Sequence, residues 1–366
     1  MTLILVQILA LLSFPLICLL WGAGVFDFLQ IRLDNQFNAT SAKVLFGLVV
    51  VCYLTLILKT LGFSWGIVVA LIWILPQFKL WHMRSAITKA FRFKITFNFC
   101  LFFFIVLYIG TSLFDLDTGI KTIWFSNYGD LPYHFGMITS FAFGENFPPE
   151  YHLYPGEQLS YPFLINLWTA LLWQINQSWI YLDLIFCYQW VFLWILIYRL
   201  LDADRFLLLP WAILFGGGVF LGITQNSAEL ISAGLGWTTL IETIWVPQRS
   251  ALFGLVAFVF VARELAFALS GKVLSSSVLL VLGLLIALMP LMHTYFWMLS
   301  WAFSAFYLLY RLYQKDFSRR HLILLGFLLL SCVWLLFLND KQGVLDFMQG
   351  WATGDDERQW LSLIHI

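Results

Sequence analysis

Long apolar blocks constrain the fold of this chain more than any motif does. Several of these blocks approach the roughly 20 residues that an α-helix needs to cross a bilayer. Hydrophobic residues make up 61% of the sequence and charged residues only 11%, whereas a soluble domain has about 25% charged residues. A soluble protein of this composition could not cover its core with polar surface. We therefore predict an all-α fold, a polytopic bundle of transmembrane helices. The apolar segments are residues 3–25, 44–58, 62–80, 95–114, 161–176, 179–200, 206–222, 251–269, 278–293, 295–310 and 322–338.

Net charge and cysteine placement exclude several other classes of protein. The formal net charge is zero, so no basic field suggests nucleic acid as a partner. All five cysteines fall inside apolar blocks and none forms a CxxC pair. We expect them to be buried small side chains, without a disulfide or a metal–thiolate site. The first apolar block lacks a basic start and a small-residue cleavage site, so we interpret it as a retained span.

The distribution of basic residues predicts the orientation of the chain. Residues 79–94 carry five Lys or Arg and no acid, which is typical of a cytoplasmic turn. Residues 115–157 carry six acids and one lysine, so this loop is expected outside. The later basic turns, near Arg199, Lys272 and Arg311, are then cytoplasmic only if one apolar segment between the acidic loop and Arg199 does not cross the membrane.

Residues 161–176 are the segment that best fits a non-spanning helix. The segment is short, has Pro162 near its start, and carries Asn166, Gln174 and Asn176. We expect a juxtamembrane or re-entrant helix under the first outer loop. The prediction is then about ten spans with the N-terminus outside, and a multi-pass protein of a bacterial plasma membrane. Residues 1–366 form one transmembrane domain with outer loops at 115–161 and 223–249. The closing residues 361–366 resemble translated adaptor sequence, so we expect a fragment truncated at its C-terminus.

The first outer loop holds the strongest candidates for chemistry. Its aromatic residues and carboxylates suit a sugar ring, because an aromatic face covers C–H groups while acids bind hydroxyls; an interfacial aromatic belt with solvated acids is the alternative. Asp130 is a candidate general base, although a helix starting at Pro132 would also make it a capping residue. His134 is its candidate partner, and Tyr133 and Tyr161 are candidate substrate contacts. Glu157 is the second candidate carboxylate, and the Pro-Gly pair before it predicts that it lies in a turn.

The second outer loop adds a candidate phosphate contact. Gln248 and Arg249 stand where the next span begins. An arginine at a helix start opposes the helix dipole, so it needs an anionic partner such as a lipid phosphate, or it is a plain interfacial anchor. His293 lies at the outer end of a later hairpin and belongs to the same side of the membrane. We assign Gln248, Arg249 and His293 to substrate binding.

The loop motifs resemble those of a known superfamily. Asp130 followed by Tyr133-His-Phe-Gly136 resembles the signature loop of the GT-C glycosyltransferases, and is similar to that of the protein O-mannosyltransferases. Asn146-Phe-Pro-Pro-Glu150, Tyr161-Pro-Phe-Leu164 and Val246-Pro-Gln-Arg-Ser250 resemble a group of bacterial multi-pass membrane proteins that carry this loop. The resemblance covers residues 124–293. Position 131 is Leu where the mannosyltransferase pattern has a second acid, which puts a paired-acid mechanism in doubt unless Glu157 supplies the second carboxylate.

The resemblance implies a membrane enzyme of the cell envelope that transfers a hexosyl group. The donor would be a polyprenyl-phosphate sugar, the acceptor a hydroxyl on a glycan, lipid or protein, and Asp130 and Arg249 would be the base and the donor-phosphate contact. The sequence has no Walker A, GxGxxG or HExxH motif. No metal ligand is assigned, and a divalent cation remains a possible cofactor. The alternatives are a transporter or flippase of a lipid-linked glycan, which charges within spans would favour, and a non-catalytic assembly subunit.

Overall fold

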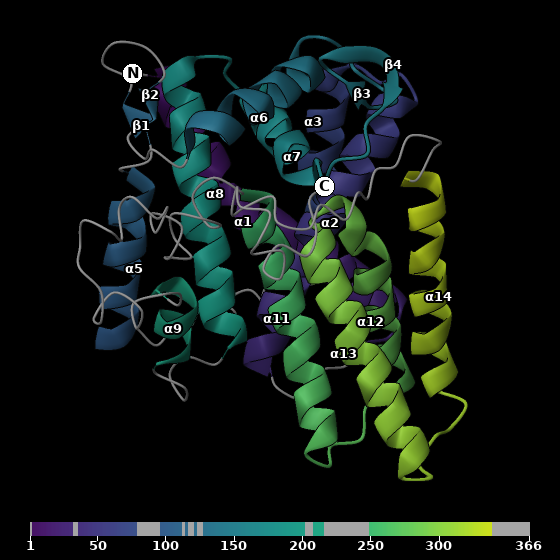
Figure 1. Ribbon diagram of the computed structural model, residues 1–366. Helices are drawn as coiled ribbons and strands as arrows, with labels where there is room; N and C mark the ends of the chain where they lie inside the picture. The colour runs from purple at the N-terminus through teal and green to yellow at the C-terminus, as the bar shows by residue number, and fades with distance from the viewer. Residues whose placement is uncertain are drawn as a thin grey trace, which may run out of the picture.

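The computed structural model is a bundle of long helices capped at one end by short helices and a hairpin (Figure 1). It describes residues 2–31, 36–78, 96–111, 114–115, 121–122, 127–201, 208–215 and 249–338. In those residues, four helical segments are long and apolar enough to cross a membrane. They are Val6–Phe28, Ala39–Thr60, Tyr181–Leu200 and Arg249–Leu269. The described residues are therefore mostly helical, and the four long apolar helices are compatible with a membrane protein.

Helices α1 (Thr2–Phe28) and α2 (Gln36–Thr60) form the closest helix pair in the bundle. Gly22 on α1 and Gly47 on α2 lie against each other's backbone, and a Cβ at either position would overlap a backbone carbonyl of the partner helix. Small residues at such crossings let helix backbones approach closely, which is how helices associate where apolar burial provides no net drive. The pair therefore packs backbone to backbone.

The remaining long helices run between the capped end and the opposite end of the bundle (Figure 1). Helix α8 packs on α11 and α5, α11 packs on α13, and α12 packs on α14. Tyr53 on α2 donates a hydrogen bond of 2.6 Å to the carbonyl of Leu288 and so links α2 to the end of α12. The bounds are α5 (Phe97–Thr111), α8 (Trp179–Leu200), α9 (Leu209–Phe215), α11 (Arg249–Leu269), α12 (Ser276–Leu288), η3 (Met289–Leu291), α13 (Thr294–Tyr313) and α14 (His321–Leu338).

Short elements cover the upper end of the bundle in Figure 1. They are α3 (Trp65–Ile74), α6 (Asn127–Ala142), β3 (Glu150–Tyr151), β4 (Tyr154–Gln158) and α7 (Leu164–Trp173). The strands β3 and β4 form an antiparallel hairpin, and β1 (Phe114–Asp115) pairs with β2 (Lys121–Thr122) in the same way. All ten residues of α7 are buried. At 1.5 Å rise per residue this helix extends about 15 Å, half the thickness of a hydrocarbon core.

Local sequence explains where several helices begin and end. The Ser178 and Ser275 hydroxyls accept hydrogen bonds from the third residue beyond them and so cap α8 and α12. Gly62 and Gly271 have positive φ angles directly after α2 and α11. At each glycine the following amide donates back to a carbonyl five residues earlier, which closes the helix end.

The sequence-based assignments agree with this fold in outline and differ in three places. Each predicted apolar segment contains a helix, although the described parts of several are short. The prediction of an all-α fold was incomplete, because two small hairpins interrupt the helices. Helix α6 begins at Asn127 rather than at Pro132, so Pro132 lies inside it. Glu157 lies within strand β4 rather than in a turn. Residues 79–94, 223–248 and 339–366 are outside the described part of the chain.

Candidate functional site

Arg249, the first residue of α11, lies at the centre of a buried polar cluster. Only 6% of its surface is exposed. Its Nη1 donates to the Gln189 Oε1 at 3.2 Å and to the Thr169 Oγ1 at 3.4 Å, and its Nη2 donates to the Asn166 Oδ1 at 3.3 Å. The guanidinium carbon lies 3.8 Å from the centroid of the Phe186 ring. Helices α7, α8 and α11 therefore hold one guanidinium between them.

Asn166 extends this cluster to α6. Its Nδ2 lies 3.0 Å from the Nδ1 of His134, which is also buried. The Asn166 oxygen must face Arg249, because a guanidinium only donates, so the amide nitrogen faces His134. The His134 Nδ1 therefore accepts, and in the neutral ring the hydrogen is on Nε2. We call His134, Asn166, Thr169, Gln189 and Arg249 the Arg249 cluster.

The charge of Arg249 is not neutralised by any carboxylate among the described residues. Its polar partners are two amides and one hydroxyl, and the described ion pairs involve other residues. An uncompensated buried charge is strongly unfavourable, and the dipole of α11 adds to the effect because its positive end lies at Arg249. The arrangement therefore favours an anion beside this helix start.

Two side-chain nitrogens of the Arg249 cluster that lack a hydrogen-bond partner also favour an anion. The His134 Nε2 and the Gln189 Nε2 have no hydrogen-bond partner in the described part of the chain. The tautomer derived above makes the first a donor, and an amide nitrogen is always a donor. Spare donors beside a positive charge suit an anion with several acceptor oxygens, and they do not suit a metal ion.

His134 is held neutral at its place in α6. Burial and the positive charge of Arg249 lower the pKa of His134 to about 3. A histidine with such a pKa is a poor acid and a poor base near neutral pH. What it offers is a fixed Nε2–H donor.

Aromatic rings pack against the buried His134 ring. The centroid of the Tyr161 ring lies 5.8 Å from that of His134 and 5.3 Å from that of Tyr133. His152 packs on Tyr133 at 5.1 Å, and burial lowers the pKa of the His152 imidazole. The predicted residues Tyr133, His134 and Tyr161 thus lie together, and Arg249 is linked to them through Asn166.

Asp130 occupies the first turn of α6, four residues before His134. Residues four apart lie on the same face of a helix. Asp130 therefore belongs to the face of α6 that carries His134. Gln248 lies outside the described residues.

Glu157 and His293 are placed apart from the Arg249 cluster. Glu157 lies in β4, where all five residues are exposed. His293 precedes α13, and its Cβ faces Gly254 on α11. Gly254 is five residues beyond Arg249, which is about 140° further around the helix. Neither residue is within hydrogen-bonding distance of Arg249 in the described contacts.

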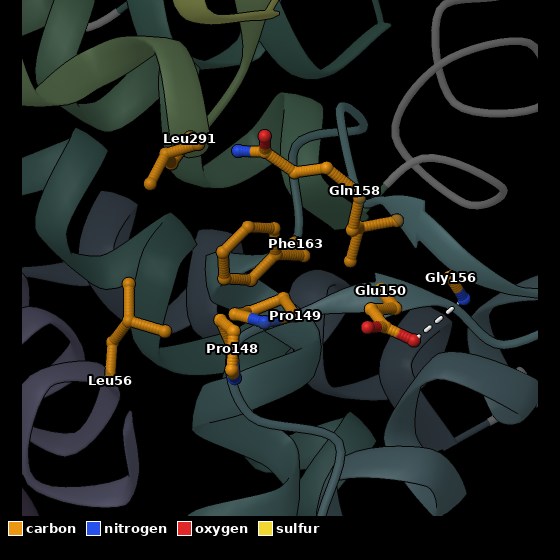
Figure 2. A pocket seen from close by; sticks show the side chains of 9 residues that line it. Leu56, Pro148, Pro149, Glu150, Gly156, Gln158, Phe163 and Leu291 are labelled. Atoms are coloured by element: carbon orange, nitrogen blue, oxygen red, sulfur yellow. Dashed lines mark hydrogen bonds between the residues drawn. The ribbon is translucent and has the colours of Figure 1, made fainter. Parts of the chain in front are cut away.

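A separate pocket of about 410 Å³ opens beside the β3–β4 hairpin (Figure 2). It has apolar walls and two polar side chains, Glu150 and Gln158. One Glu150 carboxylate oxygen accepts a hydrogen bond of 2.8 Å from the Gly156 amide. The lining residues are Leu56, Pro148, Pro149, Glu150, Gly156, Gln158, Leu159, Phe163 and Leu291.

Asn166, Thr169 and Gln189 were not recognised from the sequence as functional residues. Asn166 was noted only as a sign that its segment does not span. The available signal was polar residues at helical spacing inside apolar segments, since Asn166 and Thr169 are three residues apart. Within the described residues, no three His, Cys, Asp or Glu gather as metal ligands.

Comparison with known proteins adds no relative to this description. No protein-family model, curated protein or solved structure matches the chain.

Proposed function

We propose that this chain is a membrane glycosyltransferase that takes a sugar from a polyprenyl-phosphate donor and passes it to a hydroxyl acceptor at the outer face. The observation that carries the proposal is Arg249, a buried guanidinium held by neutral acceptors and surrounded by spare donors. A phosphate diester or monoester supplies the missing negative charge and several acceptor oxygens. A lipid-linked donor would bring such a phosphate to the end of a span.

The transfer step follows from this placement of the donor. The bond between the anomeric carbon and the phosphate oxygen breaks as the acceptor oxygen bonds to that carbon. The proton of the acceptor hydroxyl passes to the Asp130 carboxylate, and polyprenyl phosphate leaves. Arg249 and the His134 Nε2–H stabilise the negative charge that develops on the leaving phosphate. One displacement inverts the anomeric configuration.

The proposed topology has about ten spans, with the capped end of the bundle outside. The arrangement in Figure 1 supports it. The end of α8, the α11–α12 turn and the α13–α14 turn, which carry basic residues, lie at the end opposite α6 and the β3–β4 hairpin. Basic turns favour the cytoplasmic side. We propose a multi-pass protein of a bacterial plasma membrane on the same grounds.

The direct test is transfer by the purified chain in nanodiscs, measured as release of polyprenyl phosphate from lipid-linked sugars in the presence of mixed glycan acceptors. Asp130→Asn should lower kcat at least about 100-fold, since removing a general base has effects of this size. Asp316→Asn is the matched control, because Asp316 is an exposed carboxylate at the opposite end. Full activity in folded Asp130→Asn protein would exclude Asp130 as the base.

The same experiment separates the enzyme from a transporter. A flippase would carry a fluorescent lipid-linked glycan across the bilayer of proteoliposomes and release no polyprenyl phosphate. Translocation without release would overturn the proposal of an enzyme while leaving the anion site at Arg249 in place. Neither release nor translocation, in protein that still binds polyprenyl phosphate, would favour an assembly subunit.

A further inference from the structure

The pocket beside the β3–β4 hairpin differs chemically from the Arg249 cluster. Its lining includes the Glu150 carboxylate and no Lys, Arg or His. A phosphate would meet a like charge there and is disfavoured. The amide of Gln158 adds one acceptor and one donor group. Glu150 and Gln158 therefore offer hydrogen-bonding groups to neutral hydroxyls from two sides of the pocket (Figure 2).

The rest of the pocket lining is apolar. Figure 2 shows Phe163 and Pro149 between Leu56 and Leu291 on one side and Glu150 on the other. Rings of proline and phenylalanine cover C–H groups, and carboxylate and amide groups bind hydroxyls. A pyranose has both features, with hydroxyls around its rim and C–H groups on its faces. The volume of about 410 Å³ is within the usual range for small-molecule sites.

Helix α7 links this pocket to the Arg249 cluster. Phe163 lines the pocket and immediately precedes α7. Its carbonyl accepts a hydrogen bond of 2.9 Å from the amide of Asn166, the residue that holds Arg249 and His134. One helical turn, about 5 Å of rise, separates the two sites along the helix. One turn of chain therefore carries a residue of each site.

The Glu150 carboxylate is fixed in place before any ligand binds. It accepts from the Gly156 amide across the hairpin. The Asn146 side chain donates to the Glu150 carbonyl at 2.8 Å and accepts from the Glu150 amide at 2.9 Å. The Gly156 bond restricts the Glu150 side chain and the Asn146 bonds restrict its backbone, which reduces the entropy lost on binding.

We infer that this pocket binds a pyranose ring of the acceptor glycan, with hydroxyls on Glu150 and Gln158 and a C–H face on Phe163 and Pro149. The inference rests on the proposed function, because it assigns an acceptor class to the transferase. The structure thereby gives the two substrates different sites, one rich in donors and positive charge and one with a carboxylate.

The test is ligand-observed NMR on the chain in nanodiscs, with methyl glycosides of glucose, galactose, mannose and N-acetylglucosamine as probes. At least one probe should receive saturation from the wild-type protein. Leu56→Trp should abolish the signal by filling the pocket. Glu150→Gln should weaken binding about tenfold, because it replaces a charge-assisted hydrogen bond by a neutral one. Leu330→Trp, an exposed leucine on α14, is the control for a new tryptophan.

The outcomes distinguish this inference from the proposed function. Absence of binding by all four probes, or binding that Leu56→Trp leaves unchanged, would overturn the pocket assignment, and a parallel titration with polyprenyl phosphate shows whether Arg249 still binds its anion. Sugar binding that Leu56→Trp removes, in a chain that does not bind polyprenyl phosphate, would support the pocket and contradict the proposed donor. Thermal unfolding of each variant identifies loss of fold.

Discussion

Two arginines lie near opposite ends of α11, and they differ in their partners and in their position relative to the helix dipole. Arg311 on α13 donates to the Ala268 carbonyl at 2.5 Å and to the Lys272 carbonyl at 3.4 Å, and it pairs with Asp316 at 3.0 Å. It therefore lies at the negative end of the α11 dipole with a carboxylate partner. Arg249 lies at the positive end without a carboxylate among its described partners. Both side chains are largely buried, since 12% of the Arg311 side chain and 6% of Arg249 are exposed.

From this difference we infer that Arg311 has a structural role and that Arg249 binds an anionic ligand. Arg311 closes the end of α11, where a cation is favoured by roughly 0.3–1 kcal/mol in addition to its hydrogen bonds. Arg249 has three hydrogen bonds and the Phe186 ring as partners, but its charge is neither neutralised by a described carboxylate nor aligned with the helix dipole. Residues that are unfavourable for folding yet fixed by neighbours are expected where a ligand completes the site.

The largest effects are expected when each arginine loses its charge in turn. Arg249→Gln should weaken polyprenyl phosphate binding about 100-fold, within the range for removing one partner of a buried charge pair. The melting temperature should stay level or rise, because an unpaired buried charge is lost. Arg311→Gln should lower the melting temperature and leave phosphate binding intact. Fluorescence titration in nanodiscs, with the matching polyprenol as the uncharged ligand, measures the first effect. A melting temperature that falls equally in both variants would show that Arg249 is structural.

A second variant converts the Arg249 environment into that of Arg311. Asn166→Asp would give Arg249 the carboxylate that it lacks, with nearly the same side-chain shape. Phosphate binding should fall about tenfold or more, since the guanidinium would be neutralised internally. The melting temperature should change little, because the new ion pair with Arg249 is offset by loss of the amide donor to the His134 Nδ1. Asn166→Leu is the control, because it removes the amide without supplying a charge. Unchanged phosphate affinity in Asn166→Asp would place the anion elsewhere.

Lys59 is a third buried cation, and its partners can be compared with those of the two arginines. Its Nζ donates to the Phe63 carbonyl at 3.1 Å, pairs with Glu145, and lies 4.8 Å from the centroid of the Trp65 ring. It resembles Arg311, and it ties the loop after α6 to the end of α2. Lys59→Met should destabilise the fold by about 1–2 kcal/mol, because it removes the hydrogen bond to the Phe63 carbonyl and the cation over the Trp65 ring. Glu145→Gln should have a smaller effect, since that carboxyl side chain is 64% exposed. Thermal unfolding in detergent and proteolysis of residues 143–160 provide the measurements; equal losses in both variants would contradict this ranking.

The smallest expected effect is a pH dependence caused by His134. The folded pKa of about 3 is below the ordinary value of 6.5. The unfolded chain therefore takes up a proton below pH 6.5 that the native protein does not, and stability falls as pH falls through this window. Between pH 7 and 5.5 the loss should be about 1 kcal/mol. His134→Gln should remove this part of the pH dependence in thermal unfolding. An identical slope in the variant would mean that His134 is protonated in the native state.

The helical architecture could be predicted from the sequence because span length and apolarity are local properties. The predicted segment 179–200 has the same bounds as α8. The hairpin could not be predicted in this way, since β4 is exposed throughout and carries no alternation of apolar and polar residues. Pro132 offered one helix start signal in this region, because proline favours the first turn, whereas α6 begins five residues earlier at Asn127.

The sequence predicted Arg249 and His134 as site residues, but it did not predict the amide side chains that link them. Arg249 stands out because an arginine at a helix start opposes the dipole, and the motif around Asp130 draws attention to His134. Their link depends on Asn166 and Gln189, which are 83 and 60 residues from Arg249 in sequence. No local pattern specifies that α7 and α8 bring these amides to one guanidinium. Lys59 and Glu145, 86 residues apart, illustrate the same limit.

The complete burial of α7 has a mechanical consequence for the site. Bilayers differ in thickness, and spans that contact lipid respond by tilting or by deforming the membrane around them. Helix α7 contacts only protein, and it is this helix that carries Asn166 and begins beside the pocket. A change in lipid composition reaches it only through the helices that enclose it. We therefore expect the geometry of the proposed site to depend little on the thickness of the surrounding bilayer.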